Sequence, residues 1–358
     1  MSSDRYWDTK PELKLAVVAA TLYLAYFFYL RSALGFDVMR SDVLHYWKLS
    51  FSWDTIYIKY WAPGYPFVVA LVREVTLNAL PAVAVMTLTA GTGYLVSVLT
   101  VYKLAKELGV PQAFELALLF AVFPFSGLAY SVYPVSDNVA TALLLLCLLN
   151  FNRKKWWAFS LFMAFMVVMH KATWFFAAPL TMIVFFKYKE ARTVIPLAAV
   201  PLLFVLIAGA THYNDLIWFI RRDATYNYGW TILPVFDGLF GNFFVGSTTS
   251  ILKGMIVLIL LAAAIGILVY SYRFRFWLGV SIAIAMLLLG VWVNHHAIWS
   301  LVRFGKVSLL PIAYLLSHHS DSIKLPERLA TLPFNVLFLA GLLSNLLFGY
   351  YMAAFYYK

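Results

Sequence analysis

Apolar runs of roughly twenty residues alternate with short polar connections along most of the chain, and a helix of that length is needed to cross a bilayer. Pro124 and Gly127 interrupt one of the runs and predict a bent helix there. The pattern predicts an all-α, polytopic transmembrane bundle of about ten or eleven spanning helices. The candidate spans are 13–34, 80–102, 112–130, 137–150, 156–169, 172–186, 193–210, 251–270, 277–293, 307–316 and 333–355.

Two long polar segments stand out from this pattern, 34–66 and 211–250, and we expect both to lie outside the bilayer on the same face. Residues 64–75 form an apolar run that is too short to span, so we expect a helix lying in the membrane interface. Proline in the APGYP sequence suits the first turn of that helix. Without a flexible linker or a repeat of fixed period, the whole chain, 1–358, is expected to be one integral domain.

Composition supports a membrane protein and excludes several functions. Hydrophobic residues make up 63% of the chain, charged residues 12%, and the mean hydropathy is +0.82. The single cysteine, Cys147, lies in an apolar run, which excludes an internal disulfide and disfavours a cysteine nucleophile. The net charge is +11, but the basic residues are scattered and form no stripe. Anionic membrane lipids are therefore favoured as partners over nucleic acid.

The distribution of Lys and Arg predicts the orientation. The polar first residues and the long apolar run after them predict an uncleaved anchor with a cytoplasmic N-terminus. Basic residues in short connections mark the cytoplasmic side, and they are Lys103, Lys106, Arg153, Lys154, Lys155, Lys187, Lys189, Arg192, Arg273 and Arg275. The other face also carries many cations, mixed with acids and aromatics. A phosphate-bearing substrate on that outer face would explain them.

Three aspartates are candidates for chemistry on the outer face. Asp42 is followed by His45 and Tyr46, which share a face with it if this segment is a short helix. The Asp42 carboxylate then either accepts a proton from a hydroxyl group or is a solvated loop residue, and Asp37 is a second choice. Asp137 lies where a helix is predicted to begin, so it either caps that helix or points into an outer cavity.

Two pairs of basic residues predict a phosphate site. His170 and Lys171 lie between apolar runs, where charge is costly unless it meets water, a partner or a ligand. They are expected to contact phosphate or to extend to the membrane surface. Arg303 and Lys306 are three residues apart on one helix face, and the planar guanidinium fork matches phosphate oxygens. The alternative for this pair is a membrane-edge anchor.

Two pairs of adjacent polar residues are weaker candidates. Arg221 and Arg222 point in different directions on a helix, so we expect one of them at most to meet a ligand. His295 and His296 lack the spacing of four residues that metal-binding helices use. We therefore expect no metal here, although Asp42 and Asp137 could bind one.

The order of the motifs resembles one enzyme family. SDVLHYWKLS at 41–50 is followed by WAPGYPFVVAL at 61–71 and, late in the chain, by RFGKVSLLP at 303–311. This order, together with the hydropathy layout, resembles the multi-spanning class C glycosyltransferases. The likeness is to the mannosyl and aminoarabinose transferases that use dolichyl- or undecaprenyl-phosphate sugars.

The resemblance implies roles for particular residues. It makes Asp42 the catalytic base and Arg303 a contact of the donor phosphate, and Asp137 stands where related enzymes often carry a glutamate. Val43 departs from the paired acidic motif of the protein mannosyltransferases, and the chain lacks the large soluble C-terminal domain of oligosaccharyltransferases. These departures argue against transfer of a whole glycan to protein.

The expected reaction is therefore inverting transfer of one sugar, mannose or another hexose, from a polyprenyl-phosphate carrier to a glycan, lipid or protein. It would take place on the outer or luminal face of a plasma or endoplasmic-reticulum-type membrane, with no cofactor required. The expected donor-phosphate contacts are Arg303, Lys306, Lys171 and Arg222. The expected acceptor or sugar contacts are Asp37, His45, Tyr46, Asp137, His170 and His296. A transporter or flippase of an anionic lipid is the alternative, and it is disfavoured because the chain shows no matching halves.

Overall fold

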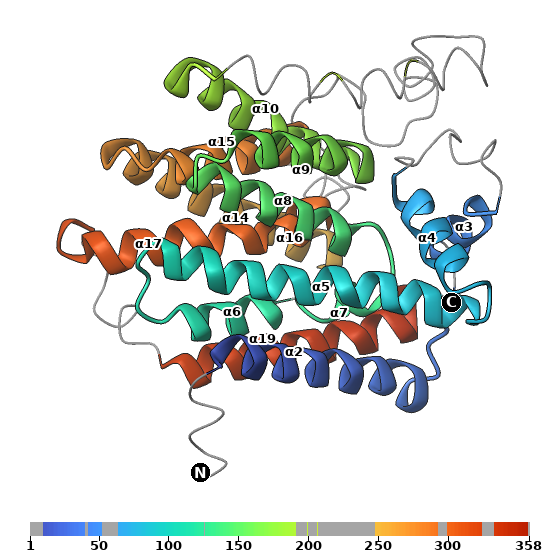
Figure 1. Cartoon of the computed structure of the whole chain (residues 1–358). Coiled ribbons are helices and arrows are strands. Elements are labelled where there is room, and N and C mark those ends of the chain that lie inside the picture. The colour runs from blue at the N-terminus through green and yellow to red at the C-terminus, as the bar shows by residue number, and fades with distance from the viewer. Residues whose placement is uncertain are drawn as a thin grey trace, which may run out of the picture. The chain divides into compact units, whose positions relative to one another are not determined.

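The computed structural model describes residues 10–39, 42–51, 64–124, 126–190, 199, 206, 248–292, 299–323 and 333–356 (Figure 1). Every regular element in these ranges is a helix, which confirms the all-α prediction. Four of the helices are long and apolar enough to cross a membrane, namely Pro11–Ala33, Ala82–Glu107, Gly254–Arg273 and Phe334–Ala354. Shorter apolar helices are Asp137–Asn152, Trp156–Met169, Trp174–Tyr188 and Trp277–Gly290. The chain therefore has the helices of an integral membrane protein.

Apart from the run at 112–130, which is divided between Ala113–Ala121 and Ala129–Val132, the predicted bounds of the described helices agree with the structure to within about five residues. The predicted span at 193–210 and the segment at 211–250 lie outside the described residues, apart from 199, 206 and 248–250, and the last three begin the helix Thr248–Arg273. The total of ten or eleven spanning helices therefore stays a prediction. The contacts of the chain group into two compact units, 1–51 with 65–145 and 312–358, and 52–64 with 146–311. The expectation of one integral domain also stays a prediction.

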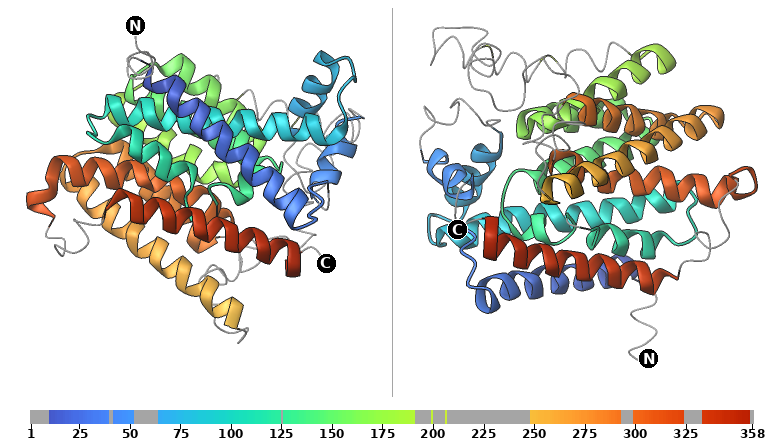
Figure 2. Two further views of the ribbon diagram at one scale, coloured as in Figure 1. Left: turned by 90° about the horizontal axis from the view of Figure 1, so that it is seen from below. Right: turned by 180° about the vertical axis from the view of Figure 1, so that it is seen from behind.

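The first unit is built on long helices that pack side by side (Figure 1, Figure 2). α5 contacts α2 and α6, and α19 contacts α6 and α7. Its elements are α2 (Pro11–Phe28) continuing as η1 (Tyr29–Ala33), α3 (Asp42–Leu49), α4 (Gly64–Val75), α5 (Ala82–Glu107), α6 (Ala113–Ala121), α7 (Ala129–Val132), the first part of α8 (Asp137–Asn152), most of α17 (Leu309–His319), η7 (Ser320–Ser322), α19 (Phe334–Tyr351) and η8 (Met352–Tyr356).

The predicted bend in the third apolar run is a complete break between α6 and α7. Proline has no N–H and cannot continue a helix, and Pro124 follows the end of α6 at Ala121. Gly127 is required by crowding, since a Cβ there would lie 2.4 Å from the backbone nitrogen of Phe123. A break inside an apolar bundle leaves backbone groups that need partners.

The side chain of Asn345, on α19, supplies those partners. Its Nδ2 atom donates to the carbonyl oxygens of Val122 at 3.0 Å and Phe123 at 3.1 Å, and to Gly341 on its own helix at 2.8 Å. Its Oδ1 atom accepts the N–H groups of Leu128 and Ala129, both at 3.0 Å. One fully buried side chain therefore satisfies the backbone on both sides of the break.

The second unit holds the later helices, in which α15 packs against both α14 and α10. Its elements are the second part of α8, α9 (Trp156–Met169), η2 (Lys171–Thr173), α10 (Trp174–Ile183), η3 (Val184–Tyr188), α14 (Thr248–Arg273), α15 (Trp277–Trp292), α16 (Trp299–Gly305), η6 (Lys306–Ser308) and the first residues of α17. A Cβ at Gly290 on α15 would lie 2.5 Å from Leu261 of α14, so these two helices are in close contact.

Candidate functional site

The predicted short helix that carries Asp42 exists as α3, and its residues differ in exposure. Asp42 is half-buried, His45 is exposed and Tyr46 is buried. Asp42 and Tyr46 are four residues apart and therefore lie on the same side of the helix. The expectation of a helix is confirmed, and Asp42 lies at its first turn, at the edge between buried and exposed surface.

Two tyrosines fix α3 and α4 to the segment that precedes α8. The hydroxyl of Tyr46 shares a hydrogen bond of 3.1 Å with Ser136 Oγ, and the hydroxyl of Tyr65 donates to the carbonyl of Pro134 at 2.9 Å. The two rings meet edge to face, with their centroids 4.8 Å apart. Both tyrosines are almost fully buried. The position of Asp42 is thus set by contacts made one turn further along its helix.

Asp137 lies at the other side of this cluster and is also buried, with 4% of its surface exposed. It is the first residue of α8, in the turn where the positive end of the helix dipole favours a carboxylate. Burial raises the pKa of the Tyr65 hydroxyl well above its usual value, and the neighbouring charges of Tyr46, Tyr23 and Asp137 raise it further. Tyr65 therefore remains a neutral hydrogen-bond donor near Asp137.

The start of α8 is held in place by Asn138, the residue after Asp137. Its Nδ2 atom donates to the carbonyls of Ala90 at 3.1 Å and Ser131 at 2.7 Å. A Cβ at Gly93 of α5 would lie 2.8 Å from the Asn138 backbone, so α5 and α8 approach closely here. This packing gives Asp137 a rigid support.

Asp37, the second-choice aspartate, has a local role in the structure. It is exposed, and its Oδ1 atom accepts the backbone N–H of Met39 at 3.0 Å. This is the hydrogen bond of an Asx turn, in which an aspartate folds the chain back on itself. The contact accounts for an aspartate at this position without a substrate.

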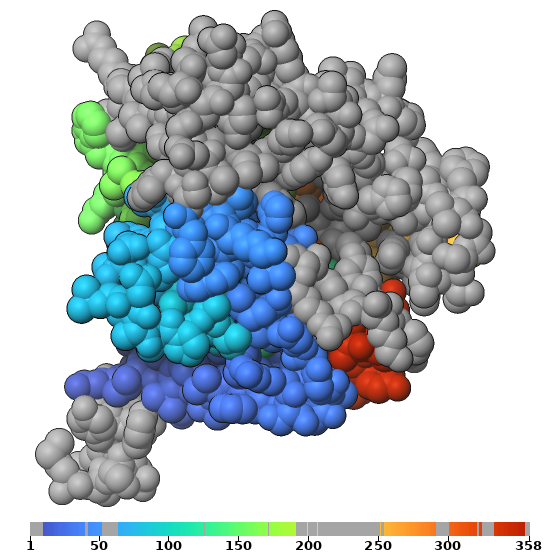
Figure 3. Space-filling model, turned by 90° about the vertical axis from the view of Figure 1, so that its right-hand side faces the viewer, coloured from blue at the N-terminus to red at the C-terminus, as the bar shows by residue number. Residues whose placement is uncertain are grey.

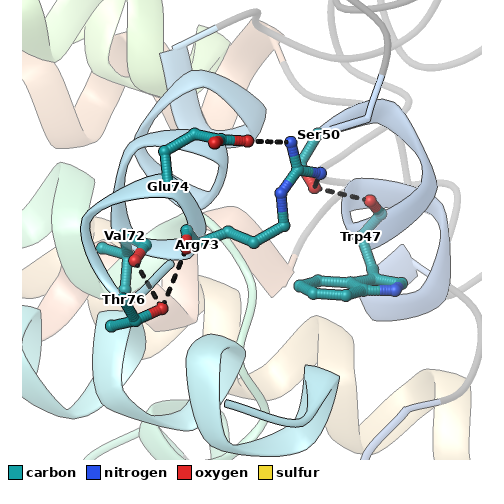
Figure 4. Close-up of polar contacts among 6 residues, drawn as sticks. All are labelled: Trp47, Ser50, Val72, Arg73, Glu74 and Thr76. Atoms are coloured by element: carbon teal, nitrogen blue, oxygen red, sulfur yellow. Dashed lines mark hydrogen bonds and ion pairs between the residues drawn. The ribbon is translucent and has the colours of Figure 1, made fainter. Parts of the chain in front are cut away.

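Sequence reasoning missed a buried arginine between α3 and α4. The Arg73 guanidinium lies over the ring of Phe51, 4.1 Å from its centroid. Its Nη2 atom is 2.7 Å from the Glu74 carboxylate, and its Nη1 atom donates to Ser50 Oγ at 3.4 Å (Figure 4). Ser50 in turn donates to the carbonyl of Trp47. Arg73 therefore fastens the end of α3 to α4. In Figure 3 the atoms of these two helices adjoin in one continuous blue patch.

A signal for Arg73 existed in the spacing of α4. Tyr65, Val69 and Arg73 are each four residues apart and are all buried. A charged residue that continues the buried stripe of a helix is expected to be paired, because burying an unpaired charge is costly. The prediction of an interfacial helix at 64–75 rests on the length of the apolar run alone and not on this stripe.

The second unit brings His170 against the helix that carries Arg303. Phe304 follows Arg303 on α16, and its ring lies 5.4 Å from that of His170 and 5.9 Å from that of Phe176. His170 Nδ1 accepts the backbone N–H of Ala172 at 3.1 Å, so in the neutral ring the proton is on Nε2. His170 and the helix of Arg303 are therefore in contact through Phe304.

Among the predicted cations whose side chains the structure describes, Lys306 is the most buried. Only 5% of its surface is exposed, while Arg303 and His170 are half-buried. Lysine is rarely buried to this degree in proteins, because its ammonium group loses its water. Lys171 begins η2 directly after His170, and its side chain lies outside the described residues.

Some of the predicted residues fall outside the structure described. Arg221, Arg222, His295 and His296 all lie in such ranges, so their predicted roles stay predictions. Within the described part of the chain, no group of three His, Cys, Asp or Glu side chains could hold a metal ion. The carboxylates Asp42 and Asp137 belong to the first unit and the cations to the second.

Comparison of the chain with known protein families, with curated proteins and with solved structures finds no match. The resemblance to class C glycosyltransferases therefore rests on the short sequence motifs and the hydropathy layout.

Proposed function

We propose that this protein is a membrane glycosyltransferase that transfers one hexose from a polyprenyl-phosphate carrier to a hydroxyl acceptor on the outer or luminal face. The observation that carries the proposal is Lys306, buried beside a half-buried Arg303 in an apolar helical unit. Ionisable residues retained within membrane helices usually serve a ligand or an ion pathway. Arginine followed three residues later by lysine offers two-point and point-charge contacts to a phosphate.

The chemistry assigns a role to each group. Asp42 takes the proton of the acceptor hydroxyl as its oxygen attacks the anomeric carbon. The bond between that carbon and the phosphate oxygen breaks on the opposite side, so the configuration inverts and the lipid phosphate leaves with its bonding electrons. Arg303 and Lys306 stabilise the charge that develops on the phosphate, since cations fixed in place need no reorganisation. Lys171 and Arg222 are further candidates for this contact.

The half-buried position of Asp42 supports its role as the base. Its helix is held by Tyr46 and Arg73, so the carboxylate is positioned by buried contacts and still has an exposed side. A general base contributes about 10²–10⁴-fold to a rate, so Asp42→Asn should lower kcat by that factor. Glu74→Gln is the matched control, because it also replaces a carboxylate by an amide in this region and Gln can still accept from Arg73.

The experiment uses the purified protein in sealed vesicles of phosphatidylcholine that contain a radiolabelled polyprenyl-phosphate hexose. We expect label to move to a short glycan acceptor, and Asp42→Asn to abolish this while Glu74→Gln leaves it intact. Full transfer by Asp42→Asn would refute the assignment of the base. Movement of labelled lipid across the bilayer without transfer of the sugar would show that the protein is a lipid flippase and not a glycosyltransferase.

A further inference from the structure

Three helices of the second unit end in the same kind of turn, and each turn has a basic residue in the left-handed conformation. Lys154, Lys189 and Arg275 have φ angles of 55°, 58° and 56°. This conformation is strained for residues with a Cβ, and glycine is the usual choice at a helix end. In the first unit, Gly109 takes that position after α5, with φ of 73°. The second unit keeps basic side chains where glycine would fit with less strain.

Contacts between aromatic and basic side chains show that the three turns are neighbours. Tyr188, at the end of η3, has its ring 5.1 Å from that of Trp156 and 6.0 Å from Lys154 Nζ, which joins the second turn to the first. Lys187 Nζ lies 5.3 Å from the ring of Trp277, which joins the second turn to the third. The turns thus form one surface, which we call the basic-aromatic surface.

The basic-aromatic surface carries more positive charge than its helix ends require. One cation near each helix C-terminus is accounted for by the negative end of the helix dipole. Within 151–156, 187–190 and 272–277, Glu190 is the only acidic residue. The exposed basic residues of these turns are Arg153, Lys154, Lys155, Lys187, Lys189, Arg273 and Arg275.

The position of the surface indicates the chemistry of its partner. It includes Arg273, where the apolar helix α14 ends, and Trp277, where α15 begins. The end of a spanning helix lies at the depth of the lipid headgroups. Tryptophan and tyrosine favour that layer, and clustered Lys and Arg favour anionic lipids. The ammonium groups of Lys154 and Lys187 lie near aromatic rings, and both side chains are exposed, so they are accessible to lipid phosphates.

We propose that the basic-aromatic surface binds the headgroup phosphates of anionic phospholipids in the cytoplasmic leaflet. This goes beyond the proposed transfer reaction and does not depend on it. It also deepens the general expectation of anionic lipid as a partner, because it assigns the contact to three particular turns. The surface would hold these lipids in preference to zwitterionic ones by charge complementarity.

The test uses the full chain reconstituted in bilayers of equal parts phosphatidylcholine and phosphatidylglycerol. After extraction in a mild detergent, mass spectrometry measures the ratio of the two lipids retained on the protein. One variant removes a charge from each turn, with Lys154→Asn, Lys187→Gln and Arg275→Asn, since asparagine tolerates the left-handed conformation. A matched variant keeps every charge, with Lys154→Arg, Lys187→Arg and Arg275→Lys.

We expect phosphatidylglycerol to be enriched on the wild type and on the charge-conserving variant. Neutralisation should lower the enrichment by roughly fivefold per cation removed. Lys103→Gln with Lys106→Gln, on α5, should leave it unchanged. Absence of enrichment on the wild type, or equal loss with the α5 variant, would overturn the proposal. If the neutralised variant fails to fold, the wild type is measured in about 1 M salt, where screening of the charges must lower its enrichment in phosphatidylglycerol.

Discussion

Replacing Asn345 by leucine tests a buried polar side chain that makes five hydrogen bonds. Leucine has the same branched outline and the same number of side-chain heavy atoms but neither an acceptor nor a donor, so the N–H groups of Leu128 and Ala129 lose their acceptor in a buried place. Leaving a buried donor unsatisfied costs about 1–3 kcal/mol, which gives roughly 2–6 kcal/mol for the two. The three carbonyl groups that contact the amide nitrogen lose a donor as well.

A second estimate comes from hydrogen bonds measured in membrane proteins. These average about 0.6 kcal/mol, so the five that Asn345 makes correspond to roughly 3 kcal/mol. The two estimates overlap at about 3 kcal/mol. This loss is a large part of the free energy of unfolding of a typical domain, which is about 5–15 kcal/mol.

The assay is equilibrium unfolding in mixed micelles of a mild detergent and dodecyl sulfate, followed by tryptophan fluorescence. Asn150→Leu is the matched control, since Asn150 is also buried in an apolar helix but donates to Leu146 of its own helix at 2.8 Å. We expect that control to lose less than about 1 kcal/mol, as for one local hydrogen bond. Equal losses in the two variants would show that the side chain of Asn345 does not hold the break.

Three further predictions concern the two halves of the candidate site. Tyr65→Phe removes the hydrogen bond to Pro134 and should lower the free energy of unfolding by about 0.5–1.5 kcal/mol at neutral pH. Burial raises the pKa of Tyr65 in the folded state, so its contribution to stability is present below about pH 10 and is lost above it. In urea titrations, the free energies of unfolding of wild type and variant should therefore converge as the pH rises. Arg73→Lys cannot keep the ring contact together with both polar contacts. Amide hydrogen exchange over 42–51 should therefore become faster by about tenfold, which corresponds to roughly 1.4 kcal/mol. Unchanged exchange would contradict the role of Arg73 in fastening α3 to α4. Lys306→Met should lower kcat for sugar transfer by about 10²–10³-fold if it faces the developing charge, whereas Lys103→Met, at an exposed lysine of α5, should keep the wild-type kcat.

The positions of the helices were predictable because one physical requirement fixes them. A segment that crosses a bilayer must be apolar for about twenty residues, so its ends are marked by the first polar residues. Trp156–Met169 and Gly64–Val75 have the bounds that the hydropathy pattern predicts, and the break after Ala121 follows from Pro124. The predicted helix bearing Asp42 also exists, because its three-and-four spacing places Val43 and Tyr46 on a buried side.

The contacts that position the site were less predictable, because they join residues far apart in sequence. Tyr46 contacts Ser136 across 90 positions, and Tyr65 contacts Pro134 across 69. Neither tyrosine differs in composition or spacing from the many others in the chain, so no local signal marks them as anchors. Charged residues are easier to notice in an apolar sequence, which explains why Arg303 and Lys306 were singled out and the neutral anchors were not.

Asn345 shows how such neutral residues could be found. A helix break in an apolar bundle must satisfy its free N–H and C=O groups with side chains, because lipid offers no hydrogen bonds. The break at Pro124 therefore requires a neutral polar partner on another helix, and asparagine is suited to it because it both donates and accepts. Asn150 lies near the end of α8 at Asn152, beside the basic turns, and Asn138 already serves the start of that helix. On α19, Asn335 lies in the first turn and Asn345 lies well inside the apolar helix, so asking which side chain satisfies a predicted break would have placed Asn345 among the candidates in the sequence.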